Sequence, residues 1–397
     1  MSAVCAACLR RSHLVACLAP RIAGLLDRPR RRPATLLALE ENELIARVAG
    51  SGGAAAARFL QTFDARSARR RLVAARIDAV CCHEESYPAG LGALDDPPPV
   101  LYIAGGADRL RAMTAGPVAT IVGTRRASPY ALEVAYELGR DVAAAGVTVV
   151  SGLALGIDAA AHRGALAGGG KALAVLGSGA DVVSPRSNLR LYELVRERGV
   201  ICSELPPGQR AFRWSFPARN RIMAGLGAIT VVVEAADPSG SLITAAFAAD
   251  IGREVGAVPG RVTARLAAGS NRLLRDGASV IRDADDVLDA LFGARERHVA
   301  PSDRGPAKVS EASAEPAAEG PGRAPGLPTR PAGRAAEPLE PRLRSVLQSV
   351  EAGAGPAEIA RDGGLSAADV RAALGRLELL GLVRRDVLGM YERTARR

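Results

Sequence analysis

Short runs of apolar and β-branched residues alternate with longer helix-like segments between residues 79 and 293. This alternation is typical of a parallel sheet whose strands are joined by helices that lie on both of its faces. It therefore predicts an α/β fold with a doubly wound, mostly parallel sheet. The predicted strands are residues 118–122, 147–150, 172–176, 200–202, 229–233 and 254–258.

Composition separates three further regions from this central one. Residues 1–78 are rich in arginine, alanine and leucine with helix-like apolar spacing, which predicts a small helical N-terminal domain. Residues 294–340 are rich in proline, alanine and glycine and lack aliphatic periodicity, which predicts a disordered linker. Residues 341–397 are predicted to form three helices, 341–350, 356–362 and 366–380, and two short strands, 382–384 and 388–391, the pattern of a winged helix.

The size and charge of the chain limit its class. Its length of 397 residues exceeds that of one ordinary domain, and its 48% hydrophobic content supplies a sizeable core. The formal net charge of +10 favours nucleic acid or another polyanion as partner, although an arginine-rich composition also arises from a GC-rich genome. No apolar run reaches the roughly 20 residues that span a bilayer, and no secretory cleavage site follows the apolar stretch after Arg11. We therefore expect a cytoplasmic protein.

Four residues near the N-terminus have spacing similar to that of a zinc knuckle. Cys5, Cys8, His13 and Cys17 spell C-x2-C-x4-H-x3-C, but the segment between Cys8 and His13 lacks the glycines of a tight metal-wrapping turn. The other cysteines, at positions 81, 82 and 202, lie in apolar strand-like runs, where a reduced and buried thiol is the ordinary state. We expect neither a cofactor nor a metal, and Cys5, Cys8, His13 and Cys17 are the candidates should a metal bind.

The loop after the first predicted parallel strand has the features of an anion site. In a doubly wound sheet, ligands bind in the crevice outside the carboxyl ends of the strands. A helix is expected to begin at Pro129, and its N-terminal amides and two adjacent arginines could hold phosphate. The alternative is a capped turn with solvated arginines. The candidate residues are Gly123, Thr124, Arg125, Arg126 and Ser128.

Three later loops reach the same predicted edge. Asp158 and His162 lie one turn apart after the second strand, but the carboxylate is interpreted as a helix cap and no nucleophile accompanies it, so no catalytic site is predicted. The lone Gly177-Ser178-Gly179 does not complete a dinucleotide-binding fingerprint. The small polar residues of the last loop either donate hydrogen bonds to phosphate or simply form a turn. They are Ser239, Gly240, Ser241 and Thr244.

Residues 211–221 interleave three arginines with three aromatic rings, in a chain with only six Phe, six Tyr and one Trp. Arginines pair with phosphates and rings stack on unpaired bases, so this mixture suits a flexible polyanion with exposed bases. The alternative is a buried cluster of rings at the entrance of a strand, with solvated arginines beside it. The rings are Phe212, Trp214 and Phe216, and the arginines are Arg213, Arg219 and Arg221.

Taken in order, these motifs resemble those of the DNA-processing protein A family, also called DprA or Smf. They are GTRRAS (123–128), SGLALGIDAAAH (151–162), VLGSGAD (175–181), SELPPG (203–208), FPARNRIMAGL (216–226), VVVEA (231–235), SGSLIT (239–244) and VPG (258–260). The resemblance implies an extended Rossmann-like domain without an established catalytic activity. It further implies a protein that binds incoming single-stranded DNA, dimerises and helps to load the RecA recombinase during natural transformation.

The resemblance also implies a basic pocket. The family's phosphate-binding arginine matches Arg125, and the basic position of its Y-P-x-x-N motif matches Arg186, where Ser184 replaces the family's tyrosine. The F-P-x-R-N-R motif is intact, with Phe216 as a stacking or core ring, Arg219 and Arg221 as phosphate contacts and Asn220 as an organiser of the pocket. If four arginines engage four phosphates, the binding constant should fall with salt at a log–log slope of about −3.

The expected winged helix has two possible partners. Ser366 as a helix cap, Arg371 and Arg376 on the recognition helix, and Arg384 and Arg385 on the wing could contact duplex DNA. Asp369 and Glu378 share that helix, which favours a protein contact equally.

Two other classes of protein share parts of this pattern. A nucleotide enzyme of the phosphoribohydrolase type has a similar sheet, but its catalytic carboxylates are missing here. A winged-helix regulator with a ligand-sensing domain is disfavoured because a long flexible linker would transmit little strain.

Overall fold

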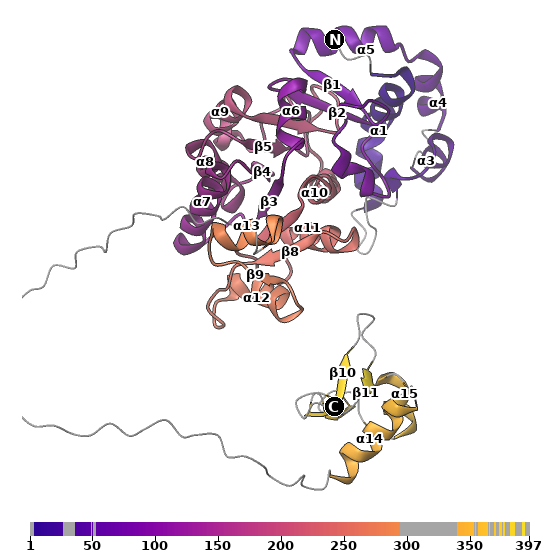
Figure 1. Cartoon of the computed structure of the whole chain (residues 1–397). Helices are drawn as coiled ribbons and strands as arrows, with labels where there is room; N and C mark the ends of the chain where they lie inside the picture. Colours follow the sequence, from indigo (N-terminus) through magenta and orange to yellow (C-terminus); the bar gives the residue numbers. More distant parts are fainter. Residues whose placement is uncertain are drawn as a thin grey trace, which may run out of the picture. The chain divides into compact units, whose positions relative to one another are not determined.

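The computed structural model describes residues 4–26, 36–48, 50 and 53–293, and near the C-terminus residues 340–352, 354, 356–363, 365, 369–370, 373–374, 376–377, 382–385 and 391–393. They belong to two compact units, one within residues 1–303 and the other within residues 304–397 (Figure 1). Apart from residue 340, the predicted linker lies outside the described residues. No helix in these ranges combines the length and apolar character needed to cross a membrane.

The first unit is built on a nine-stranded sheet in the order β1-β2-β6-β5-β4-β3-β7-β8-β9. Neighbours from β6 to β9 are parallel, whereas β2 pairs antiparallel with both β1 and β6. The doubly wound, mostly parallel sheet is confirmed. The strands are β1 (Asp78–Cys81), β2 (Val100–Ala104), β3 (Val118–Val122), β4 (Thr148–Ser151), β5 (Ala172–Val175), β6 (Val200–Ser203), β7 (Ile229–Val232), β8 (Glu254–Ala257) and β9 (Ser279–Val280).

All six strands predicted from the sequence are present, within one residue at each end. Strands β1, β2 and β9 were not predicted from the sequence. The first two precede the parallel strands in the chain and pair antiparallel with each other at one side of the sheet, and β9 has only two residues. The alternation that identified the other strands is typical of parallel strands joined by helices, so it does not single out an antiparallel pair, and two residues are too few to show a strand pattern.

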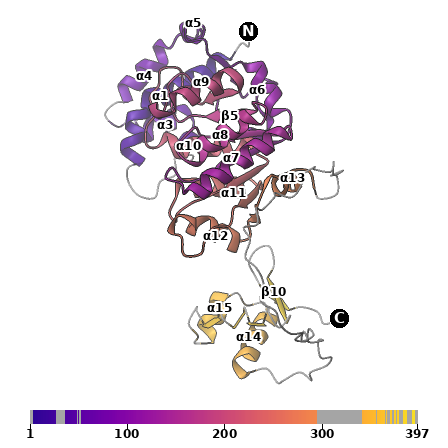
Figure 2. The same ribbon diagram turned by 90° about the vertical axis from the view of Figure 1, so that its left-hand side faces the viewer.

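Helices cover both faces of the sheet (Figures 1 and 2). Ala119 and Ile121 of β3 contribute to one hydrophobic core, while Val118 and Val122 contribute to the other, as the alternation of side chains in a strand requires. One core includes residues of α7 (Pro129–Ala144), α8 (Ile157–Ala167), α9 (Leu189–Arg198) and α13 (Ala284–Phe292). The other includes residues of α6 (Ala107–Thr114), α10 (Ser215–Leu226) and α11 (Gly240–Asp250), with α12 (Ala268–Arg275) packed against it through Leu273.

The local sequence of α7 explains where this helix begins and which side it buries. Ser128 accepts a hydrogen bond from the amide of Ala131, and Pro129 occupies the first turn, where its missing N–H costs nothing. Apolar residues then recur at helical spacing, with Ala131, Ala135, Leu138 and Val142 buried on the sheet.

The strand order reverses at β3. The chain runs from β3 through β4 and β5 to β6 on one side, and β7, β8 and β9 follow on the other side. The carboxyl ends of these parallel strands lie along one edge of the sheet, here called the carboxyl edge. In open α/β sheets, ligands bind outside this edge at the point where the order reverses.

The N-terminal segment is helical, as predicted, and packs on the sheet domain. Its helices are α1 (Ala6–Leu26), α3 (Glu41–Val48), α4 (Gly53–Thr62) and α5 (Ala65–Ala75). Leu14, Leu18 and Ile22 of α1 share a core with Leu205 and Trp214 of the sheet domain. The hydroxyl of Tyr102 on β2 donates to Ser12 Oγ at 3.0 Å.

The second unit contains α14 (Pro341–Glu351), α15 (Pro356–Asp362), further helical residues between 369 and 377, and an antiparallel pair, β10 (Val383–Arg385) and β11 (Tyr391–Arg393). Leu343, Ile359, Leu377 and Val383 belong to one hydrophobic core. Arg376 forms an ion pair with Glu340 at 3.3 Å, so this candidate DNA contact has an internal partner. Ser366, Arg371 and Glu378 lie outside the described residues.

Candidate nucleic-acid interface

The loops after β3 and β7 meet at the reversal of the strand order, where Glu234 joins them. Its carbonyl accepts the amide of Thr124 at 2.7 Å, and its carboxylate accepts both the amide and the hydroxyl of Ser128 at 2.8 Å. The amide of Arg126 donates to Thr124 Oγ1 at 3.3 Å. Several amides of the predicted anion site are therefore occupied by protein acceptors. Sequence reasoning missed Glu234 because a carboxylate in a basic loop signals no phosphate.

Two glycines allow the loops after β3 and β4 to approach closely. A Cβ atom on Gly123 would lie 2.5 Å from a side-chain carbon of Ile157 and 2.9 Å from the Glu234 carbonyl oxygen. Gly156 has a φ of +76°, and a Cβ there would lie 2.4 Å from the Thr124 carbonyl oxygen. Larger residues at these positions would separate the loops, so the glycines define the backbone of the site.

Arg125 and Phe216 bring a charge and an aromatic ring together at the carboxyl edge. The guanidinium carbon of Arg125 lies 5.1 Å from the centre of the half-buried Phe216 ring, within the range of a cation–π interaction. Ser215 places this ring, because its hydroxyl donates to the Gly177 carbonyl after β5 at 2.5 Å. Phe216 is therefore neither deep core nor fully exposed, and its edge is available to a ligand.

Three arginines at the carboxyl edge have exposed and unpaired guanidinium groups. Arg125 and Arg126 follow β3, and Arg186 begins the short helix η3 (Arg186–Asn188) after β5. Their guanidinium groups make no hydrogen bond or ion pair with any residue that the structure describes. Asn188 fixes the third loop by donating to the Leu153 carbonyl at 2.9 Å. These are the predicted phosphate contacts that the structure leaves accessible.

Arg219, predicted to contact phosphate, is instead buried beneath the edge, with 5% of its surface exposed. Its guanidinium donates to the Gly152 carbonyl at 2.8 Å and to the Val175 carbonyl, at the ends of β4 and β5, and lies 3.8 Å from Asp158. Burial lowers the pKa of Arg219, which the Asp158 carboxylate partly opposes. Arg219 therefore stabilises the loops from below rather than facing solvent.

Arg221, the other predicted phosphate contact of this helix, is 1% exposed and is also internal. It donates to both carboxylate oxygens of Glu204 at 2.8 and 3.0 Å, and to Asp96 at 2.8 Å. Burial opposes the charge of Arg221, but these two carboxylates outweigh it and raise the pKa of the guanidinium. The prediction that Arg221 contacts phosphate is wrong in this structure, because its guanidinium is buried and paired with two carboxylates. These partners belong to other segments of the chain, so the motif alone did not reveal them.

Asn220 connects the buried arginine to the last loop. Its side-chain oxygen accepts from Arg219 Nε at 3.1 Å, and its side-chain nitrogen donates to the Gly240 carbonyl at 3.1 Å. Ser239 and Ser241 share a hydrogen bond of 2.8 Å at the start of α11. The buried hydroxyl of Thr244 has no hydrogen-bond partner among the described residues. Asn220 therefore links the buried Arg219 to the loop that begins α11.

Of the other two rings, Trp214 belongs to the interior, whereas Phe212 is half-buried, and the guanidinium carbon of the exposed Arg210 lies 5.8 Å from the centre of its ring. Trp214 is 3% exposed and donates from Nε1 to the Ala19 carbonyl of α1 at 3.1 Å, with Phe212 stacked beside it. These two rings hold the N-terminal helices on the sheet domain, which supports the alternative reading for them. Asp158 is not the cap of α8, which is Gly156, but accepts the Gly152 amide at 3.1 Å, and His162 is fully buried.

The predicted metal candidates are not brought together as a set of four. His13 Nδ1 hydrogen-bonds the Leu9 carbonyl at 2.9 Å, and its ring packs on Phe63, while Cys17 is exposed. Cys5 and Cys8 face residues at the end of β1 instead.

Comparisons with known proteins identify a family for each of the two units. The family described as DNA recombination-mediator protein A matches residues 78–292, and the DprA winged helix domain matches residues 328–386. Protein Smf of Synechocystis is 36% identical over 317 residues, covering 78% of this chain and 78% of that protein. DNA processing protein DprA of Streptococcus pneumoniae is 38% identical over 205 residues, covering 52% and 71%.

A solved structure gives the same result for the fold. The X-ray structure of DNA processing protein A from Streptococcus pneumoniae superposes with a TM-score of 0.56 at 30% identity, covering 71% of this chain and 95% of that chain. The sequence matches extend over both compact units.

Proposed function

Because this chain belongs to the DprA or Smf family of DNA recombination mediators, we propose that it binds single-stranded DNA at the carboxyl edge of its sheet. There it protects incoming DNA and helps to load the RecA recombinase during natural transformation. The expected resemblance to the family is confirmed, and so is the winged-helix domain. The proposed role needs no bond to be made or broken, and it belongs in the cytoplasm, where RecA acts.

The observation that carries this proposal is the position of Arg125 over Phe216 where the strand order reverses. A strand of DNA with unpaired bases offers phosphates to a guanidinium group and flat bases to an aromatic ring. A duplex offers the same phosphates but keeps its bases stacked inside. The pairing of an exposed charge with a half-buried ring therefore favours single strands.

The exposed arginines set the expected strength of the electrostatic part. Arg125, Arg126 and Arg186 are accessible, whereas Arg219 and Arg221 are engaged inside the domain. With about 0.7 units of log–log slope per phosphate on single strands, three contacts predict a slope of about −2 rather than −3. The remaining free energy of binding comes from the ring and from uncharged donors such as Ser239.

The experiment that tests the proposal compares two steps. Titration of the full chain with a labelled oligonucleotide and with its duplex should show preference for the single strand. RecA added to the same strand already coated with a single-stranded-DNA-binding protein should then assemble faster when the chain is present, as followed by RecA ATP hydrolysis. Preference for one duplex sequence, or release of base from a nucleotide panel, would instead support a regulator or a nucleotide enzyme.

We also propose that two copies of the chain associate, which would extend the DNA-binding edge across both subunits. The proposal rests on membership of the family. Light scattering of the purified full chain should give the mass of a dimer, and a mass of one chain at all concentrations up to those used for binding would contradict it.

A further inference from the structure

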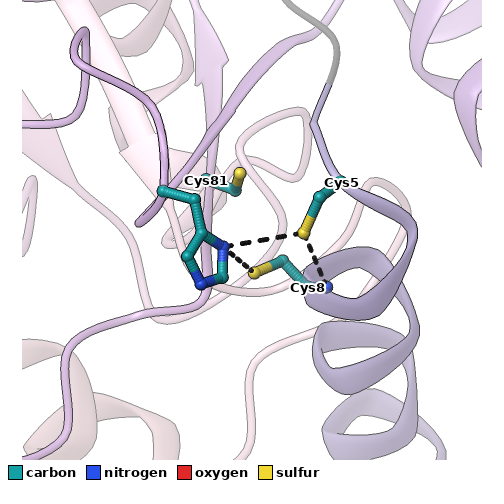
Figure 3. A group of neighbouring side chains, drawn as sticks. Cys5, Cys8 and Cys81 are labelled. Atoms are coloured by element: carbon teal, nitrogen blue, oxygen red, sulfur yellow. Dashed lines mark hydrogen bonds between the residues drawn. The ribbon is translucent and has the colours of Figure 1, made fainter.

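Cysteine and histidine side chains from two distant parts of the sequence gather where α1 begins and β1 ends. Cys5 and Cys8 lie at the start of α1, and Cys81 and His83 lie at the end of β1 and just after it. The four potential ligand atoms, three sulfurs and one ring nitrogen, all lie within 4.8 Å of one another. Figure 3 shows Cys5 and Cys8 projecting from the helix toward the strand that carries Cys81.

The distances between the sulfurs and the ring nitrogen are close to those of a metal-binding cage. Cys8 Sγ lies 3.3 Å from His83 Nδ1, and Cys5 Sγ lies 3.7 Å from the same nitrogen. In a tetrahedral zinc site with Zn–S of about 2.3 Å and Zn–N of about 2.0–2.1 Å, neighbouring ligand atoms lie about 3.5–3.8 Å apart. Both distances are close to this range, and all four ligand atoms lie within 4.8 Å of one another, so small side-chain rotations would complete the coordination of one ion.

The first two cysteines also have the backbone arrangement of a metal-binding turn. The amide of Cys8 donates to Cys5 Sγ at 3.3 Å, so a backbone N–H already supports a negative charge on that sulfur. Cys5 and Cys8 are separated by two residues, the spacing found in structural zinc sites. Cys8 and Cys81 are buried, which removes water from one side of the cage.

We propose that Cys5, Cys8, Cys81 and His83 bind a structural zinc ion that fastens the N-terminal helices to the edge strand of the sheet. Three thiolates and one imidazole fill a tetrahedral coordination sphere and leave no open position, which is the character of a structural rather than a catalytic site. On binding, the ion takes the place of the three thiol protons, which pass to solvent. Cys5 and Cys8 lie outside the residues that match the recombination-mediator family.

Cys82 also lies near the four proposed ligands and must be distinguished from Cys81 as the cysteine that β1 and the residues after it supply. Its sulfur lies 3.8 Å from Cys8 Sγ and 3.9 Å from His83 Nδ1, but it is exposed, and it is not one of the four residues whose ligand atoms all lie within 4.8 Å of one another. A disulfide between Cys8 and Cys82 is the competing use of these thiols. It would leave fewer free thiols and no metal.

The test measures zinc in the full chain, purified without a metal-affinity tag, by mass spectrometry of its elements. The wild type should carry about one zinc per chain, and Cys8→Ser and His83→Ala should lose most of it. Cys17→Ser is the matched control, because Cys17 lies on the same helix but outside the cage, and it should keep its zinc. Cys82→Ser should also keep it, and loss in this variant with retention in Cys81→Ser would overturn the assignment of Cys81.

A second set of measurements on the wild type does not depend on whether a variant folds. Exchange of the wild type with Co²⁺ should give the absorption bands of a tetrahedral site with thiolate ligands, and thiol titration under denaturing conditions should count all six cysteines. A chelator should lower the melting temperature of the wild type and leave that of Cys8→Ser unchanged. Purified wild type without zinc and without cobalt bands, or with only four titratable thiols, would overturn the proposal.

Discussion

The guanidinium group of Arg125 lies over the ring of Phe216, 5.1 Å from its centre, and so joins the loop after β3 to the start of α10. Neither residue is buried, and the backbone beside each is anchored, by Glu234 bonded to Thr124 and Ser128 in the Arg125 loop and by Ser215 next to Phe216. A charge and a flat ring are thus presented together at the carboxyl edge, which is the basis of the proposed DNA site.

Phe216→Leu should weaken binding of single-stranded DNA by about 5- to 150-fold, because stacking of a base on a ring contributes about 1–3 kcal/mol. The salt dependence should stay the same, since no charge is removed. Binding of the wild type and the variant should be measured by anisotropy at two or more salt concentrations. A parallel shift of the two curves is expected, and unchanged affinity would show that the ring serves packing alone.

Arg221→Ala should destabilise the protein rather than act on DNA directly. Removal of this guanidinium leaves Glu204 and Asp96 buried without their partner, which typically costs about 3–5 kcal/mol. Urea unfolding should show a midpoint well below that of the wild type. The folded variant should bind DNA with the same dependence of the binding constant on salt as the wild type. A shallower dependence together with normal stability would instead show that Arg221 contacts phosphate.

Gly152→Ala tests the buried position of Arg219. A Cβ atom at residue 152 would lie 1.9 Å from Arg219 Nη1, so the guanidinium or the loop must move. We expect a loss of about 1–3 kcal/mol in the free energy of unfolding. Gly240→Ala is the matched control, because a Cβ there meets no atom within 4 Å, and it should unfold like the wild type. Equal stability of both variants would contradict the packing of Arg219.

The stability of the sheet domain should decline in mild acid because of His162. Burial, reinforced by the nearby Arg219, lowers the pKa of His162 to about 3 from an ordinary value of 6.5. The unfolded chain therefore binds a proton below about pH 6.5 that the folded chain excludes until about pH 3. The contribution of His162 is complete above pH 6.5 and is lost as the pH falls, by up to about 1.4 kcal/mol per pH unit.

The measurement for His162 is the free energy of urea unfolding at pH 7.5 and at pH 5.5. His162→Leu should lose less stability than the wild type between these two values, even if it is less stable at both. An identical decline in the two proteins would mean that other groups govern the acid sensitivity.

The sequence predicted the parallel strands and the carboxyl edge well, because periodicity and the position of loops after strands are local properties. It did not separate exposed from buried arginines. Arg125 and Arg221 look alike in a motif, yet Arg221 meets Glu204 and Asp96 only after the chain has folded. Which charged side chains come together in the folded protein cannot be deduced from one segment of the sequence.

The N-terminal cysteines illustrate the same limit. Their spacing indicated a knuckle completed by His13 and Cys17, which follow at once in the sequence. The structure places Cys81 and His83 beside Cys5 and Cys8 instead, since α1 packs on the strand that carries them. Likewise, Trp214 was interpreted as part of a basic DNA-binding segment, and its ring holds α1 on the sheet domain.

The most direct test of the DNA site is the salt dependence of single-strand binding by the wild type and Arg125→Ala. Arg140→Ala is the matched control, because Arg140 lies near the C-terminal end of α7, away from the carboxyl edge, and pairs with Asp141. The wild type and the control should show a log–log slope of about −2, and Arg125→Ala should bind more weakly with a slope shallower by about 0.7. Binding by Arg125→Ala with the affinity and slope of the wild type would contradict a DNA site at the carboxyl edge.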